Sequence, residues 1–129
     1  MKDEARIWFN YAGENLKSAG VLLKSSLFNP CLQNVQQCIE KAIKALLIEN
    51  NIQPKKTHDI YELNLLLNKN KMHIDISEEE CDLINTIYLP SKYPLGSALP
   101  DFEPDYNFCS NVFEIAKRVF TDIENQLNQ

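Results

Sequence analysis

The chain has 129 residues, of which 44% are hydrophobic and 24% are charged, a balance that lets a protein bury a core. Its formal net charge of −5 disfavours unassisted nucleic-acid binding, which usually needs a basic surface, but leaves room for a local basic patch or a basic partner. Only three glycines occur, which favours helices over hairpins. Without a break in composition, we expect a single domain over residues 1–129.

The cysteines and the hydropathy pattern indicate the cellular compartment of the protein. Cys31, Cys38, Cys81 and Cys109 form no C-x-x-C pair and lack zinc-finger spacing. We expect them to be small buried hydrophobic residues, with a metal or redox site as the alternative. The chain shows no secretory signal pattern, and no segment approaches the ~20 apolar residues that span a bilayer. These features predict a reduced, cytoplasmic protein with no metal, no cofactor and no membrane contact.

Three long segments have apolar residues at helical spacing: residues 3–26, 30–50 and 105–127. We expect Asn29 to cap the second segment, since Pro30 suits the first helical position, where its missing N–H needs no partner. The second segment is apolar around so much of its circumference that it should be central. The broad apolar coverage of the second and last segments predicts a homodimer or a complex with a partner.

Two shorter helices are predicted between the long ones. One begins near Thr57, and the other begins at Ser77, where Ser77 and Glu80 have capping-box spacing. Four prolines interrupt residues 89–104, so we expect the helix to end at Pro90 and a loop to follow, and loops of this length are often functional. The predicted fold class is all-α, an up-and-down helical bundle of four to five helices.

A polar segment with the sequence KKTHDI occupies residues 55–60, at the start of the third predicted helix. In one interpretation, Thr57 caps the helix, Asp59 lies in its first turn and His58 is simply exposed. In the other, the lysines, His58 and the helix N-terminus form an anion-binding corner, where His58 could also move protons in RNA cleavage. Residue spacing alone leaves both open.

A second polar and aromatic segment, YLPSKYP, occupies residues 88–94. Its tyrosines could pack against the bundle with Lys92 in water, or Lys92 could contact a phosphate while Tyr93 stacks on a base. The other histidine, His73, forms no recognisable ligand set. No zinc-protease, P-loop, dinucleotide-binding or nucleophile-elbow motif is present.

Taken together, these segments resemble a known family. Trp8 and Tyr11 give the first helix an aromatic character, residues 36–47 read QQCIEKAIKALL, and residues 56–60 read KTHDI before the Tyr93-Pro94 loop and a last helix with Ala116. This order resembles the HEPN domain proteins of bacteria and archaea, in the branch usually encoded beside a minimal nucleotidyltransferase. The resemblance implies a helical bundle that dimerises, often within a two-gene toxin–antitoxin or nucleotidyltransferase pair.

The chain departs from the family's ribonuclease motif. Many HEPN domains are metal-independent ribonucleases with an R-x4-6-H motif, but Arg6 and Arg118 are the only arginines and neither precedes a histidine at that spacing. Where relatives often have Arg-Tyr-Pro, this chain has lysine at position 92, which lacks the bidentate fork of arginine. His58 matches the family's T-H-D position rather than the catalytic histidine.

The leading hypothesis is therefore a non-catalytic or weakly active HEPN subunit that binds a nucleotide, RNA or a nucleotidyltransferase partner. Its polar corner would consist of Lys56, His58, Asp59, Lys92 and Tyr93, with the helix start and the proline loop on the same side of the bundle. One alternative is a metal-independent ribonuclease whose composite site forms at a dimer interface, with His58 as acid or base and Lys92 stabilising the phosphorane. Another is a purely structural helical adaptor.

Overall fold

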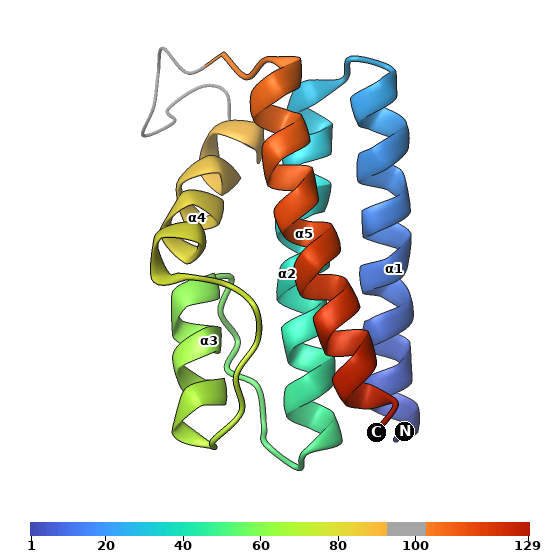
Figure 1. Cartoon of the computed structure of the whole chain (residues 1–129), viewed down its shortest axis with the longest axis vertical. Coiled ribbons are helices and arrows are strands. Elements are labelled where there is room, and N and C mark those ends of the chain that lie inside the picture. The colour runs from blue at the N-terminus through green and yellow to red at the C-terminus, as the bar shows by residue number, and fades with distance from the viewer. Residues whose placement is uncertain (93–102) are drawn as a thin grey trace.

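The computed structural model describes residues 1–92 and 103–129, with the backbone alone described at 88–92. The helices are α1 (Asp3–Lys24), α2 (Phe28–Glu49), α3 (Ile60–Lys69), α4 (Glu78–Lys92) and α5 (Tyr106–Leu127). None of the described residues is in a strand. The prediction of an all-α, up-and-down bundle of four to five helices is confirmed (Figure 1).

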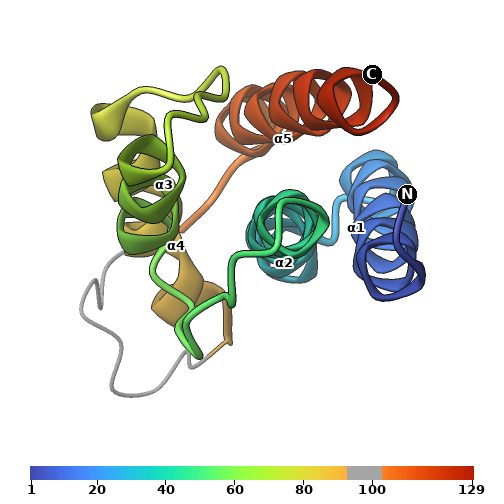
Figure 2. The same ribbon diagram turned by 90° about the horizontal axis from the view of Figure 1, so that it is seen from below.

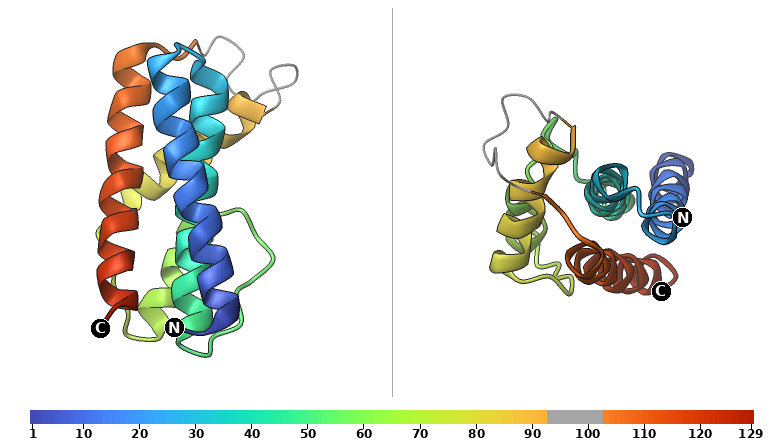
Figure 3. Two further views of the ribbon diagram at one scale, coloured as in Figure 1. Left: turned by 90° about the vertical axis from the view of Figure 1, so that its right-hand side faces the viewer. Right: turned by 90° about the horizontal axis from the view of Figure 1, so that it is seen from above.

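Helix α2 lies at the centre of the bundle (Figure 2). α1 runs antiparallel to α2 on one side, α5 packs against both α1 and α2, and α3 and α4 cover the opposite flank of α2. Viewed from the side and from above, α1, α2 and α5 form a group of three long helices (Figure 3). α3 and α4 both begin near the middle of α2 and run in opposite directions (Figure 1), so the α2–α3 linker climbs back along α2.

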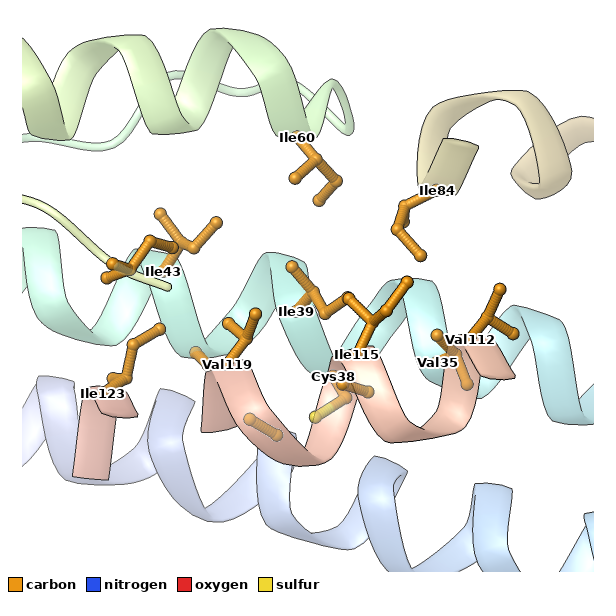
Figure 4. Close-up of a cluster of buried hydrophobic side chains, with 14 of the residues drawn as sticks. Val35, Cys38, Ile39, Ile43, Ile60, Ile84, Val112, Ile115, Val119 and Ile123 are labelled. Atoms are coloured by element: carbon orange, nitrogen blue, oxygen red, sulfur yellow. The ribbon is translucent and has the colours of Figure 1, made fainter. Parts of the chain in front are cut away.

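The hydrophobic core surrounds α2. Ile39 and Ile43 of α2 are fully buried, and Ile60 of α3 and Ile84 of α4 lie on one side of them, with the side chains of α5 on the other (Figure 4). Burying one such side chain contributes roughly 1.5–3 kcal/mol. The prediction that the second helix is central is confirmed. All four cysteines are also buried and unbridged, as expected for small core residues.

Helices α1 and α5 approach closely because glycines leave room for phenylalanine rings. A Cβ atom at Gly20 would lie 3.2 Å from Cζ of Phe113, and one at Gly13 would lie 3.5 Å from Cζ of Phe120. The ring of Phe120 also stacks on that of Phe9, with centroids 4.5 Å apart. The aromatic rings of α5 therefore pack directly against the backbone of α1.

The predicted start of the second helix and the predicted end of the fourth are wrong. α2 begins at Phe28 with Leu27 as N-cap, so Asn29 is not the cap; it and Pro30 lie in the first turn, where N–H groups have no intrahelical partner and proline is still tolerated. α4 runs past Pro90 to Lys92, so the helix does not end at this proline. The Ser77–Glu80 capping box is confirmed by two reciprocal hydrogen bonds of 3.0 Å.

Candidate functional site at the start of α3

Helix α2 carries three buried polar side chains on one face, at every fourth residue. Gln36 is 0% exposed, Glu40 is 3% exposed and Lys44 is 8% exposed. A charge in such a position is costly unless it is paired and hydrogen-bonded. These three side chains therefore need hydrogen-bonding or ionic partners, and each of them has such a partner in the structure.

Glu40 is the centre of this network. Its Oε2 accepts a hydrogen bond from Nζ of Lys44 at 2.8 Å, and its Oε1 accepts one from Nε2 of Gln36 at 3.0 Å. Nδ1 of His58 lies 2.8 Å from the same Oε1. Burial alone would raise the pKa of Glu40, but the hydrogen bonds from Lys44, Gln36 and His58 and the charge of Lys44 hold its pKa below the ordinary value. The carboxylate is thus kept ionised.

Lys44 also interacts with an aromatic ring of α1. Its Nζ lies 5.4 Å from the centroid of the Trp8 ring on α1. A cation over an indole face is attracted by the ring's quadrupole, and the attraction grows when water is excluded. The ammonium group of Lys44 therefore interacts with both a carboxylate and an aromatic face.

His58 connects this buried network to the surface. Its side chain is 63% exposed, whereas the side chain of Glu40 is only 4% exposed. The backbone oxygen of His58 also accepts a hydrogen bond from Nε2 of Gln36 at 3.2 Å. Two contacts thus fix the residue on α2 and orient the ring through Nδ1.

Asp59 ends the linker and starts α3. Its Oδ1 accepts hydrogen bonds from the backbone N–H of Glu62 at 3.2 Å and from Nδ2 of Asn85 on α4 at 2.8 Å. Oδ1 of Asn85 in turn accepts the backbone N–H of Ile60 at 2.9 Å. Asp59 is therefore both the N-cap of α3 and a link to α4.

The predicted start of this helix near Thr57, with Thr57 as its cap, is wrong. α3 begins at Ile60, and Oγ1 of Thr57 instead accepts the backbone N–H of Asp59 at 3.0 Å. Aspartate is a somewhat better cap than threonine, and Oδ1 of Asn85 accepts one further backbone N–H of the first turn, that of Ile60. The threonine shapes the turn that precedes the helix.

The other predicted site residues lie around this corner or outside the described residues. Lys56 is exposed two residues before His58. Lys92 is the last residue of α4, about 10 Å along the helix axis from Asn85 at ~1.5 Å per residue; its side chain, Tyr93 and the proline loop lie outside the described residues. The predicted same-side arrangement of helix start and loop therefore stays a prediction.

The sequence interpretation missed Gln36, Glu40 and Lys44 as members of the site. Their spacing was a usable signal, because polar residues at every fourth position of a helix predicted to be central must lie on one face and be largely buried. Asn85 had no such signal, since its contact with Asp59 joins residues 26 positions apart.

Two features are absent from the described residues. Over residues 1–92 and 103–129, no group of histidine, cysteine, aspartate or glutamate side chains has the arrangement of a metal site. Across the same part of the chain, no helix has the length and apolar character needed to cross a membrane.

The fold and the polar network are those of an all-α bundle with a surface histidine anchored on a buried carboxylate. The family model of the HEPN domain matches residues 5–126. The chain therefore belongs to the HEPN domain family, which confirms the resemblance carried by the second-helix block and the T-H-D segment.

One named relative is similar to part of the chain. A protein of Methanocaldococcus jannaschii named "Putative toxin MJ1304" is 44% identical over 48 residues, which is 37% of this chain and 32% of that protein. The chain thus matches about one third of that relative's length.

Solved structures share the fold. The crystal structure of TT1696 from Thermus thermophilus has a TM-score of 0.79 at 23% identity, over 96% of this chain and 98% of that one. The crystal structure of ST0689, described as an archaeal HEPN homologue, has a TM-score of 0.72 at 21% identity, over 98% and 99%.

Proposed function

We propose that the chain is the HEPN subunit of a two-gene, toxin–antitoxin-like system and binds nucleotide or RNA phosphate at its polar corner. The corner consists of Lys56, His58, Asp59, Lys92 and Tyr93. The observation that carries the proposal is the exposed His58 ring held 2.8 Å from the buried carboxylate of Glu40. A site that is fixed in advance loses less conformational entropy when it binds.

Within the corner, the residues have different tasks. The carboxylate of Asp59 already caps α3 and links it to α4, so its part is to position the corner rather than to contact an anion. Contact with phosphate falls to His58, the exposed Lys56 and Lys92 at the end of α4, with Tyr93 as a stacking surface. The two lysines would act within a chain whose net charge is −5.

The system around the subunit is part of the same proposal. The family resemblance supports a single domain over residues 1–129 that forms a homodimer and pairs with a minimal nucleotidyltransferase in the cytoplasm. The M. jannaschii relative carries the word toxin in its name, which supports the toxin-like assignment.

The test uses the two histidines of the chain as a matched pair. Binding of a fluorescein-labelled single-stranded RNA of about ten nucleotides is followed by anisotropy. His58→Ala should weaken binding by about tenfold, whereas His73→Ala, at an exposed loop position, should leave it unchanged. Equal effects of the two variants on RNA binding would reject the proposal that RNA binds at the polar corner. If neither RNA nor nucleotides shift the melting temperature of the wild-type protein, the structural adaptor is the better account.

A metal-independent ribonuclease is the second candidate, and the Glu40–His58 contact favours it specifically. A carboxylate that orients a histidine is the arrangement of a general acid or base, and Lys92 would stabilise charge on the phosphorane. The test is cleavage of RNA in EDTA by the purified protein. Activity that disappears in His58→Ala supports this candidate, and activity that persists in that variant rejects it.

A further inference from the structure

A groove runs between α1 and α5, away from the polar corner. It has a volume of about 640 Å³ and includes Leu16 and Val21 of α1 with Tyr106 and Phe113 of α5. This volume lies in the range of ligand-binding clefts, about 300–1,000 Å³. The polar corner is built from the linker, α2 and α4, so the two surfaces share no residue.

The floor of this α1–α5 groove is apolar and partly open to solvent. Gly20 lets the ring of Phe113 lie against the backbone of α1, since a Cβ there would be 3.2 Å from the ring. Val21 is 59% exposed and Tyr106 is 52% exposed. The floor thus presents apolar and aromatic surface that no described residue covers.

The rim of the groove is basic. Lys17 and Lys24 lie on α1, and Lys117 lies on α5 with its Nζ 5.7 Å from the centroid of the Phe113 ring. Among the described residues that line the groove, Glu114 is the one acidic residue, and it pairs with Lys117 at 3.6 Å. Three lysines against one glutamate leave two formal positive charges here, although the whole chain carries −5.

We propose that the α1–α5 groove docks an acidic amphipathic helix of a partner protein. From Gly13 to Lys24 the groove follows α1 for about 16 Å at ~1.5 Å per residue, which is about three helical turns. Apolar side chains of the partner helix would lie on the floor formed by Phe113 and Val21. Its carboxylates would face the lysines of the rim, in the helix-in-groove mode of recognition.

The apolar floor distinguishes this occupant from RNA. A nucleic acid would use the lysines, but its phosphate backbone would leave Val21 and Leu16 uncovered, whereas the apolar face of a helix would remove them from water. A second copy of this chain would have to supply an acidic, apolar helix face of its own. Both alternatives give distinct results in the experiment below.

The experiment compares three labelled peptides of about 16 residues, each with the same leucine face. Their polar faces are all glutamate, all glutamine or all lysine, and binding to the full chain is followed by anisotropy. The expected order of affinity is glutamate, then glutamine, then lysine, with adjacent steps of about tenfold. No binding by any peptide, or an order independent of charge, would overturn the proposal.

Matched variants locate the site. Lys24→Glu and Lys69→Glu each reverse a charge in the last turn of a helix, so they carry similar costs in helix stability, but only Lys24 lines the groove. Lys24→Glu should weaken binding of the glutamate peptide by about tenfold, and Lys69→Glu should leave this binding unchanged. Ser110→Trp should block binding by filling the groove. Equal effects of the two lysine variants would overturn the proposal.

The same variants distinguish the proposed partner helix from the two other possible occupants, RNA and a second copy of this chain. If RNA binding, and not peptide binding, falls with Lys24→Glu, the groove is a nucleic-acid surface and the proposal fails. If the glutamate peptide does not bind while Lys24→Glu changes the oligomeric state in sedimentation, the groove holds a second copy and the proposal also fails. Neither result bears on His58, so the proposed function is tested separately.

Discussion

Nδ1 of His58 lies 2.8 Å from Oε1 of Glu40, which joins an exposed ring before α3 to a carboxylate that is almost completely buried in α2. The same carboxylate holds Lys44 and Gln36. A single buried acidic group therefore supports both the packing of α2 and the orientation of the surface histidine.

Replacing Glu40 should destabilise the protein. Glu40→Gln keeps the size of the side chain but leaves the ammonium group of Lys44 buried without its counter-charge. Removing one partner of a buried ion pair typically costs about 3–5 kcal/mol, and we expect a loss near the lower end because Trp8 still faces Lys44. Urea unfolding measures this difference.

A control for this variant exists on α5. Glu114 pairs with Lys117 at 3.6 Å, but both side chains are at least half exposed, and exposed pairs contribute about 0–1 kcal/mol. Glu114→Gln should therefore change the free energy of unfolding very little. If both variants cost the same, the buried network does not stabilise α2 as described.

The contribution of Glu40 should depend on pH. Because its pKa is lowered in the folded protein, the unfolded chain takes up the proton first as the pH falls. The stabilisation is complete above the ordinary glutamate pKa of 4.5 and is lost as the pH falls through the lower folded pKa. The difference in unfolding free energy between wild type and Glu40→Gln should thus be constant near neutral pH and shrink in acid. A difference that grew in acid would contradict this.

Asp59 should contribute more to the free energy of unfolding than an ordinary helix cap does. Asp59 and Asp105 each cap a helix by accepting a backbone N–H, from Glu62 and Phe108 respectively. Among the described residues, only Asp59 also accepts a hydrogen bond from a second helix, through Asn85. Loss of a cap costs about 1 kcal/mol, and loss of the link to Asn85 should add about 1 kcal/mol.

Chemical denaturation of the two alanine variants should therefore rank Asp59→Ala below Asp105→Ala in stability. Asp59→Asn should restore most of the loss, because asparagine keeps an oxygen that can accept both hydrogen bonds. Equal losses in the two alanine variants would show that the link between α3 and α4 is unimportant.

The two glycines of α1 should respond differently to alanine. Alanine in place of a helical glycine gains up to about 1 kcal/mol in helix propensity. At Gly13 the new Cβ would be in ordinary contact with Phe120, at 3.5 Å, so the gain should be realised. At Gly20 the Cβ would lie 3.2 Å from Phe113, so the ring must move and the gain should be reduced or lost. Melting temperatures of Gly13→Ala and Gly20→Ala test this, and identical increases would contradict it.

Local signals allowed much of this fold to be predicted from the sequence. The apolar stripe of α2 predicted its central place, and the Ser77–Glu80 spacing predicted the capping box, because both depend on residues a few positions apart. The boundary at Asn29 was wrong since the Asn-Pro signal is also compatible with the first turn of a helix. The boundary at Pro90 was also wrong, since α4 continues to Lys92.

The candidate site was only partly predictable. The sequence indicated His58 and Asp59 as part of a polar segment at a helix start, but their hydrogen-bond partners Glu40 and Asn85 lie on other helices. Glu40 was missed because a charged residue is ordinarily assigned to the solvent, and its pairing with His58 spans 18 positions. Such a contact follows from the way the linker climbs back along α2, which no local pattern encodes.

The most direct test of the central claim is an NMR titration of the imidazole signals with single-stranded RNA in EDTA. The chain has two histidines, so His73, exposed at a loop position, serves as an internal control in the same sample. We predict that RNA shifts the signals of His58 and leaves those of His73 in place, and that Glu40→Gln weakens the response. Signals of His58 that stay unchanged at saturating RNA, or shifts of equal size at both histidines, would contradict an RNA-binding corner at the start of α3.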